Sequence, residues 1–106
     1  MADDFQTFTD HKGRQIRLTN ERWEHILSHS EMVNQQERII ETLTQPELIV
    51  ATVKDESVHV YHRFYEQTPV TSKYLLVSVK ILPEDAFILT AFFSNRVKKG
   101  NVLWQP

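Results

Sequence analysis

Two histidines, His25 and His29, are the residues of this chain whose type and spacing most directly suggest chemistry. They stand four positions apart in the stretch RWEHILSHSEM, and on a helix this spacing places both side chains on one face. Such a pair could bind a metal ion, transfer protons or simply face the solvent. The stretch alone leaves all three interpretations open.

A metal site is the first interpretation to test. Zinc needs at least three protein ligands, and the acidic residue of the zinc-protease signature is absent because Ile26 and Leu27 lie between the two histidines. His11, His59 and His62 could add ligands, but no spacing favours them. The chain has no cysteine, which excludes thiolate ligands, disulfides and cysteine nucleophiles. We therefore expect no metal and no other cofactor, whereas the choice between acid–base catalysis and two surface histidines stays open.

Length and composition indicate a single soluble domain. The 106 residues are enough for one core and too few for two, so one domain is expected over residues 1–106. No run of residues reaches the length of a membrane span, and the acidic start MADDFQTF is unlike a signal peptide. A cytoplasmic protein is the expectation.

The formal net charge of -2 hides an asymmetry between the two halves of the chain. Residues 1–56 hold six Lys and Arg against eleven Asp and Glu, which gives -5. Residues 57–106 hold six against three, which gives +3. A basic half can present an anion-binding surface on an acidic protein, although a solvated mixture of charges is the plainer interpretation.

The order of the predicted elements is a hairpin, two helices and then four strands. The hairpin pairs residues 5–9 with residues 15–18 around the turn DHKG, and the helices follow over about 20–30 and 33–43. The strands are rich in β-branched and aromatic residues and span about 47–53, 57–65, 73–81 and 86–94. Trp104, in the basic tail, is expected to pack back onto the domain. The pattern predicts an α+β fold in which the two helices cover one face of an antiparallel sheet.

Alternation along the strands assigns side chains to the two faces of that sheet. Residues 75, 77, 79 and 81 form one apolar face of the third strand, and residues 87, 89, 91 and 93 are expected to form one face of the fourth. Polar groups are expected on the face away from the core, namely Arg63, Lys80 and Thr90 with Tyr61, Ser78 and Ser94 nearby. Two permanent cations, hydroxyl groups and aromatic rings would suit a phosphate backbone and an unstacked base, although any half-exposed sheet has such a face.

The order of these motifs resembles a known family over most of the chain. It is similar to the phage-associated nuclease-like domains of the barnase–EndoU–colicin–RelE (BECR) fold, which occur in toxins and mobile elements. The matching segments, in order, are ERWEHILSHSEM, IIETLTQPELI, VYHRFY, KYLLVSVK and FILTAFFSNRVKKGNVLW. The resemblance implies an N-terminal hairpin and two helices packed on a four-stranded antiparallel sheet.

The same resemblance implies a metal-independent endoribonuclease acting on RNA, including tRNA, through attack of the 2′-OH on the adjacent phosphate. It also implies an immunity or antitoxin partner. The roles that it implies are general acid–base catalysis by His25 or His29, phosphate contacts from Arg63 and Lys80, and positioning donors from Thr90 or Ser94. Tyr61, Lys98 and Lys99 would contact the flanking RNA.

Two departures from the family pattern define the alternative function. Phe92 stands where many relatives carry Tyr, and Ser30 stands where proline often follows the second histidine. A missing phenol removes a possible proton donor. A catalytically inactive RNA- or protein-binding module on the same fold is therefore the alternative, and a purely structural component of a mobile element is the third possibility.

Overall fold

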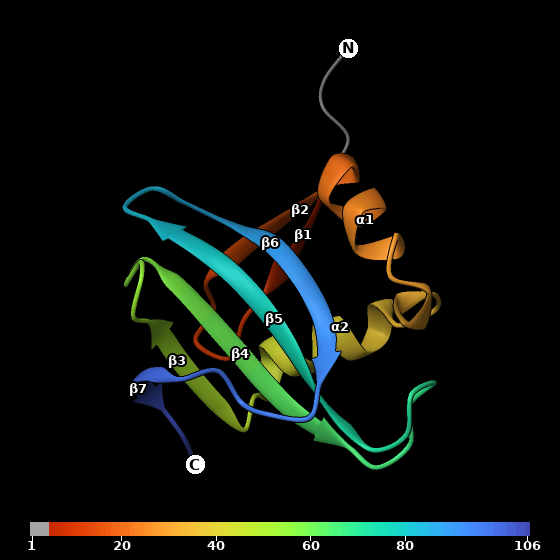
Figure 1. Cartoon of the computed structure of the whole chain (residues 1–106). Coiled ribbons are helices and arrows are strands. Elements are labelled where there is room, and N and C mark those ends of the chain that lie inside the picture. Colours follow the sequence, from red (N-terminus) through yellow and green to blue (C-terminus); the bar gives the residue numbers. More distant parts are fainter. Residues whose placement is uncertain (1–4) are drawn as a thin grey trace.

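The computed structural model describes residues 5–106 as one curled sheet with two helices beside it (Figure 1). A short 3-10 turn, η1, lies between the helices. In chain order the elements are β1 (Phe5–Thr9), β2 (Gln15–Thr19), α1 (Asn20–Leu27), η1 (Ser30–Met32), α2 (Gln36–Thr44), β3 (Leu48–Thr52), β4 (Val58–Tyr65), β5 (Lys73–Leu82), β6 (Asp85–Ser94) and β7 (Gly100–Trp104).

The sheet has seven strands in the order β1-β2-β6-β5-β4-β3-β7. The predicted hairpin is present as the antiparallel β1–β2 pair, and the predicted meander is present as the antiparallel series β3 to β6. The expected four-stranded antiparallel sheet is nevertheless wrong. The hairpin extends the sheet through a parallel β2–β6 contact, and β7 extends it at the other end through an antiparallel pair with β3.

Two long-range contacts explain why the sheet has more strands than the meander β3 to β6. Arg17 of β2 stands opposite Phe87 of β6, and its guanidinium donates two hydrogen bonds to the Asp85 carboxylate at 3.0 and 2.7 Å. At the other end, Gly100 brings β7 against β3 so closely that a Cβ there would clash with the Ala51 carbonyl and lie 2.7 Å from Val50 Cγ1. Neither contact is visible in the local periodicity of the sequence.

The helices pack on one face of the curled sheet, where they close the core. Thr19 caps α1 by accepting the Arg22 amide at 3.2 Å, so the predicted start of the first helix is confirmed. Helix α1 contacts β6 and β2, whereas α2 contacts β1, β4 and β5. In Figure 1, α2 lies behind the sheet and α1 lies beside β6. The core between helices and sheet includes Ile26, Ile39, Leu43, Leu75, Val77, Val79, Ile88 and Ala91, and Trp104 packs against it as expected.

A β-bulge changes the predicted faces of β6. The β5–β6 register shifts between Ser78 and Val79, so that Val77 pairs with Ala91 but Val79 pairs with Ile88. Ile88 is therefore fully buried in the core, although strict alternation placed it on the opposite face. The alternation predicted for β5 is confirmed, because Leu75, Val77 and Val79 are all buried in that core.

His62 fastens the last segment of the chain to the other face of the sheet. Residues 95–99 cross in front of β5 and β4 before β7 begins (Figure 1). The His62 ring is fully buried; its Nε2 accepts the Lys98 amide at 2.9 Å, and its Nδ1 lies 3.2 Å from the Leu48 carbonyl. This arrangement requires the neutral ring with its proton on Nδ1. Burial correspondingly lowers the pKa of His62 below the usual 6.5.

We expect His62→Phe to lower the free energy of unfolding at pH 7 by about 1–3 kcal/mol, because the Lys98 amide and the Leu48 carbonyl lose their partner. The stability that His62 contributes is present above its unfolded pKa near 6.5 and is lost as the pH falls through the lower folded value. Urea unfolding between about pH 7 and pH 5 should therefore show a steeper loss of stability for the wild type than for the variant. Equal slopes would contradict this role.

Candidate functional site

The two helix histidines lie at the surface. His25 belongs to α1, whereas His29 follows that helix and precedes η1, and both side chains are exposed. Their ring centroids are 6.1 Å apart in an edge-to-face arrangement, and His29 Nδ1 lies 3.9 Å from the Glu31 carboxylate. Among residues 5–106, no hydrogen bond, ion pair or ring contact joins either histidine to the strand residues expected to act with them. Their catalytic role stays a prediction.

Arg63 lies on the helix side of the sheet, which corrects the expected shared face with Lys80. Its Nη1 donates to the Gln45 carbonyl at 2.7 Å, and its guanidinium lies 3.5 Å from Glu41 and 3.8 Å from Glu47. Alternation along β4 is the physical reason: Lys80 pairs with Val58, five positions before Arg63 and therefore on the opposite face. Arg63 thus fastens β4 to the end of α2.

Lys80 and Thr90 do lie on the helix-free face, as expected. Thr90 pairs with Ser78 across the β5–β6 ladder. Lys80 Nζ donates to the Asp55 carboxylate at 2.5 Å, and this hydrogen bond, together with those from Ser57, lowers the pKa of Asp55 to about 2. The lysine therefore anchors the β3–β4 loop in this structure rather than standing free for a phosphate.

The expected RNA-contacting residues lie in three different places. The Ser94 hydroxyl caps the following turn through the amide and carbonyl of Arg96. Lys98 and Lys99 belong to the segment that crosses to β7. Tyr61 is buried on the helix side of β4, away from the face on which it was expected. The structure does not gather the predicted residues into one site.

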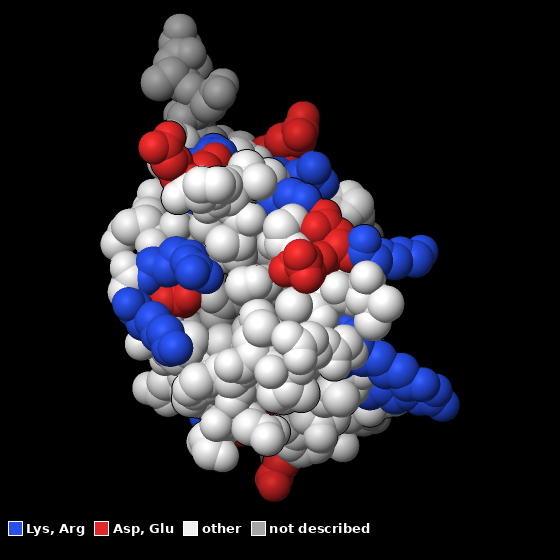
Figure 2. Space-filling model, turned by 90° about the vertical axis from the view of Figure 1, so that its left-hand side faces the viewer, with Lys and Arg blue, Asp and Glu red and all other residues white. Residues whose placement is uncertain are grey.

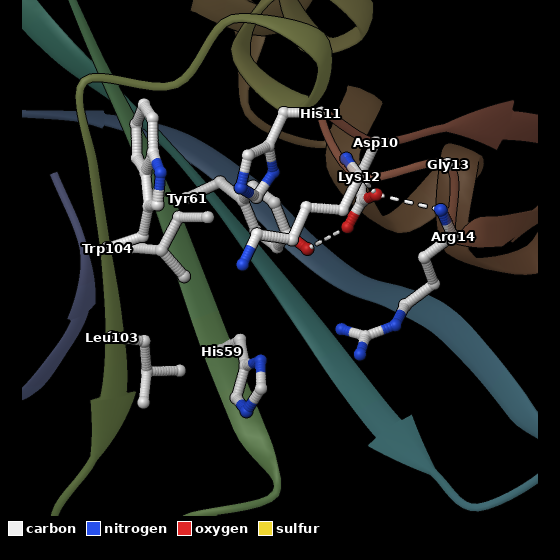
Figure 3. A pocket seen from close by; sticks show the side chains of 10 residues that line it. Asp10, His11, Lys12, Gly13, Arg14, His59, Tyr61, Leu103 and Trp104 are labelled. Atoms are coloured by element: carbon white, nitrogen blue, oxygen red, sulfur yellow. Dashed lines mark hydrogen bonds between the residues drawn. The ribbon is translucent and has the colours of Figure 1, made fainter. Parts of the chain in front are cut away.

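Tyr61 instead lines a pocket that the sequence analysis missed, which we call the hairpin pocket. It has a volume of about 470 Å³ and is closed on one side by the β1–β2 turn and on the other by β3, β4 and β7 (Figure 3). Its lining includes Asp10, His11, Lys12 and Arg14 from the turn, His59 and Tyr61 from β4, and Leu103 and Trp104 from β7.

Asp10 organises the hairpin pocket. Its Oδ1 accepts the amides of Lys12 and Arg14 at 2.9 and 2.8 Å, which shapes the turn, and Gly13 supplies the left-handed residue with φ of 87°. Its Oδ2 accepts the Tyr61 hydroxyl at 2.6 Å. Burial raises the pKa of Asp10, but these three hydrogen bonds outweigh it, so that the pKa is lowered overall. Burial and the Asp10 carboxylate raise the pKa of Tyr61, which keeps its donor proton.

His11 stands between two aromatic rings of the pocket. Its ring centroid is 4.9 Å from that of Trp104 and 6.3 Å from that of Tyr61. Both ring nitrogens are buried without a hydrogen-bond partner, whereas its amide donates to the Leu43 carbonyl at the end of α2. Burial, followed by the charges of Lys12 and Arg14, lowers the pKa of His11 against the opposing effect of Asp10. Its imidazole is therefore neutral at pH 7.

Basic side chains and a second histidine face the same space. Figure 3 shows Lys12 and Arg14 reaching from the turn into the pocket, with His59 below them on β4. Burial and then the charge of Arg14 lower the pKa of His59, and Arg14 acts in the same direction on His11. Arg14 is therefore close enough to influence both imidazoles. An anion bound beside Arg14 would meet two neutral histidines and an additional cation.

The sequence did contain a signal for this site in DHKGR, where three basic or titratable residues follow an aspartate. The stretch also reads as an ordinary turn, and only the curl of the sheet brings it beside His59 and Trp104.

Elsewhere on the surface the charges are mixed. Figure 2 shows acidic and basic side chains interspersed on one side of the molecule, without a continuous basic field.

In comparisons with known proteins, no protein-family model, no curated protein and no solved structure matches the chain. Within residues 5–106, the helices are too short or too polar to cross a membrane.

We expect Tyr61→Phe to raise the pKa of Asp10, because the carboxylate loses the hydrogen bond from the Tyr61 hydroxyl. The stability that depends on ionised Asp10 is present above its unfolded pKa and is lost as the pH falls through the lowered folded value. The loss of stability below the unfolded pKa should therefore be smaller in the variant, whereas the Asp10 carboxyl itself should titrate at a higher pH. NMR titration of the Asp10 carboxyl carbon measures the shift directly.

The matched control is Tyr65→Phe, which removes a hydroxyl that donates to Glu41 at 2.5 Å and leaves the hairpin pocket intact. It should leave the pKa of Asp10 unchanged. If both variants shift the Asp10 titration equally, the Tyr61 hydroxyl does not organise the pocket.

Proposed function

We propose that the protein is a metal-independent endoribonuclease and that the hairpin pocket binds the phosphate at which RNA is cleaved. One observation carries this proposal: His11, Lys12 and Arg14 face the same cavity as His59, although β6 and β5 separate the hairpin from β4 in the sheet. Two imidazoles with a nearby cation can supply the base, the acid and the charge stabilisation that phosphoryl transfer from RNA needs. The sequence resemblance to phage-associated nuclease-like domains supports the same chemistry.

The reaction balances without a metal ion. One imidazole accepts the proton of the ribose 2′-OH while the 2′-oxygen forms a bond to the adjacent phosphorus. The bond from phosphorus to the 5′-oxygen breaks, and the second imidazole, in its protonated form, donates a proton to that oxygen. Arg14 and Lys12 stabilise the negative charge on the non-bridging oxygens. The products are a 2′,3′-cyclic phosphate and a free 5′-OH.

The aromatic wall favours unpaired RNA as the substrate. Trp104 and His11 form adjacent ring surfaces beside the cations, and an unstacked base can lie on such surfaces. A volume of about 470 Å³ accommodates one nucleotide. Loops of tRNA offer unpaired nucleotides of this kind. A cytoplasmic, toxin-like ribonuclease of a mobile element would in turn need an immunity or antitoxin partner.

A non-catalytic RNA-binding module is the alternative, and the burial of His11 favours it. Both nitrogens of that ring are enclosed, so proton transfer to a substrate requires the ring to turn or the turn to open. Binding to the cations and to Trp104 requires neither movement. Measurements of cleavage and of binding separate the two functions.

The pH dependence of cleavage follows from the two lowered pKa values. The productive form has one protonated and one neutral histidine, and the pKa values of His11 and His59 both lie below the usual 6.5. Above both values the acid is lost, so kcat/KM should decrease about tenfold for each pH unit. We therefore expect the maximum of kcat/KM below pH 6.5, measured with a single-stranded RNA oligonucleotide in excess EDTA. A maximum above about pH 7.5 would contradict this pair.

Substitution distinguishes the hairpin pocket from the helix histidines. His59→Gln should lower kcat/KM by about 10²–10⁴-fold, because it removes a proton-transfer group. The double variant His25→Gln/His29→Gln is the control and should keep wild-type activity, since both rings lie at the surface away from the pocket. Gel analysis of tRNA cleavage, with end-group analysis for the cyclic phosphate, measures both.

Three other outcomes are informative. Loss of cleavage in the double variant alone would move the site to His25 and His29 and overturn the placement in the pocket. Salt-sensitive RNA binding without cleavage by the wild type would establish the binding module instead. Activity that disappears in EDTA and returns with a divalent metal ion would overturn the metal-independent mechanism.

A further inference from the structure

Strand β7 forms an open edge of the sheet. It is the last strand in the order and pairs only with β3 within residues 5–106. Its sequence, GNVLW, contains neither a charged residue nor proline, the usual devices that keep an edge from pairing. Val102 is 50% exposed and Leu103 is 43% exposed. The strand therefore offers unprotected backbone groups beside an apolar surface.

A groove with a lysine rim adjoins the start of β7, and we call it the lysine groove. It has a volume of about 540 Å³ and is lined by Thr52, Val53, Lys54, Val97, Lys98 and Lys99. Val53 is 84% exposed and Val97 is 40% exposed, so the floor is apolar. None of the three lysine side chains makes an ion pair or a hydrogen bond within residues 5–106. Lys99 directly precedes Gly100, and Thr52 pairs with Gly100, so the groove lies at the beginning of β7.

We propose that β7 and the lysine groove bind an acidic, extended segment of a partner protein by strand addition. Backbone groups of the added strand would pair with β7, and its alternate apolar side chains would lie over Val97 and Val102. Its carboxylates would meet Lys54, Lys98 and Lys99, which have no acidic partner among residues 5–106. A nucleic acid would satisfy the lysines but would use neither the open backbone edge nor the apolar floor, and therefore a protein strand fits this surface better.

This surface is separate from the phosphate-binding cations of the hairpin pocket, and the proposal does not depend on RNA cleavage. Leu103 nevertheless borders the pocket, and Trp104 at the end of β7 forms its aromatic wall. An added strand would therefore lie next to the mouth of the pocket.

The test is an NMR titration of the full-length protein with a synthetic peptide of about eight residues that alternates valine and glutamate. At peptide concentrations up to about 1 mM, which detect even weak binding, we expect amide shifts at Lys98, Lys99 and Gly100–Trp104. Slower hydrogen exchange in β7 should accompany them. A peptide that alternates valine and lysine should produce neither effect.

Matched charge reversals test the role of the lysine rim. Lys99→Glu should weaken peptide binding by about tenfold, because an attraction becomes a repulsion. Arg22→Glu makes the same change of charge at a half-buried position of α1, which packs against β6 and β2, and should leave binding unaltered.

The proposal would be overturned if no amide of β7 shifted at the highest peptide concentration, or if both peptides produced equal shifts. Equal weakening by Lys99→Glu and Arg22→Glu would also overturn it. So would shifts that depend only on protein concentration, because these would report binding of a second copy of the chain. An oligouridylate that shifts these amides when the acidic peptide does not would replace the protein partner by RNA. None of these results bears on cleavage by His59, so the failure of one proposal is distinguishable from the failure of the other.

Discussion

The hydrogen bond from Tyr61 to Asp10 is the contact on which the arrangement of this molecule depends. It joins the hairpin at one end of the sheet to β4, the fifth strand in the order, and both side chains are buried. Because an unpaired buried carboxylate is costly, the contact favours a curled sheet over a flat one. The hairpin pocket is the space that this curl leaves between the turn and the strands opposite it.

The cations of the strands and those of the loops have different roles. Arg17, Arg63 and Lys80 are all paired with carboxylates, and each pair fastens two elements together. The cations directed toward a cavity or groove, Lys12 and Lys99 among them, come instead from turns and from the crossing segment. Loops that a rigid sheet holds in place are common locations for binding residues. Strand cations in this protein serve the fold, and loop cations are the ones available to a ligand.

Local pattern was enough to predict the hairpin, the start of the first helix and the four-stranded meander. Local pattern could not predict that the sheet has seven strands. The parallel β2–β6 contact joins residues 17 and 87, which are far apart in the sequence. The β3–β7 pair depends on Gly100, where the two backbones approach too closely for a side chain. The faces of β4 and β6 were misassigned for two reasons. Arg63 was grouped with Lys80 without knowledge of the register, and one bulge moved Ile88 into the core.

The candidate site was less predictable than the fold. The sequence pattern predicts the wrong face for Tyr61, and no motif groups His11, His59 and Arg14, because 45 residues separate the turn from His59. Residues that meet only through tertiary structure leave no spacing for a sequence motif to record. A buried aspartate with two turn amides and one phenol as partners becomes recognisable only once Tyr61 lies opposite it.

Because these contacts join residues that are far apart in the sequence, they also affect the order in which the elements fold. The meander β3 to β6 pairs strands that are neighbours along the chain, and such pairs lose little entropy when their loops close. The hairpin can also form alone, but its attachment to β6 must close a loop of about 70 residues. The assembly order that follows is meander first and hairpin docking late, so that the pocket exists only in the completed fold and a partly folded chain carries no assembled site.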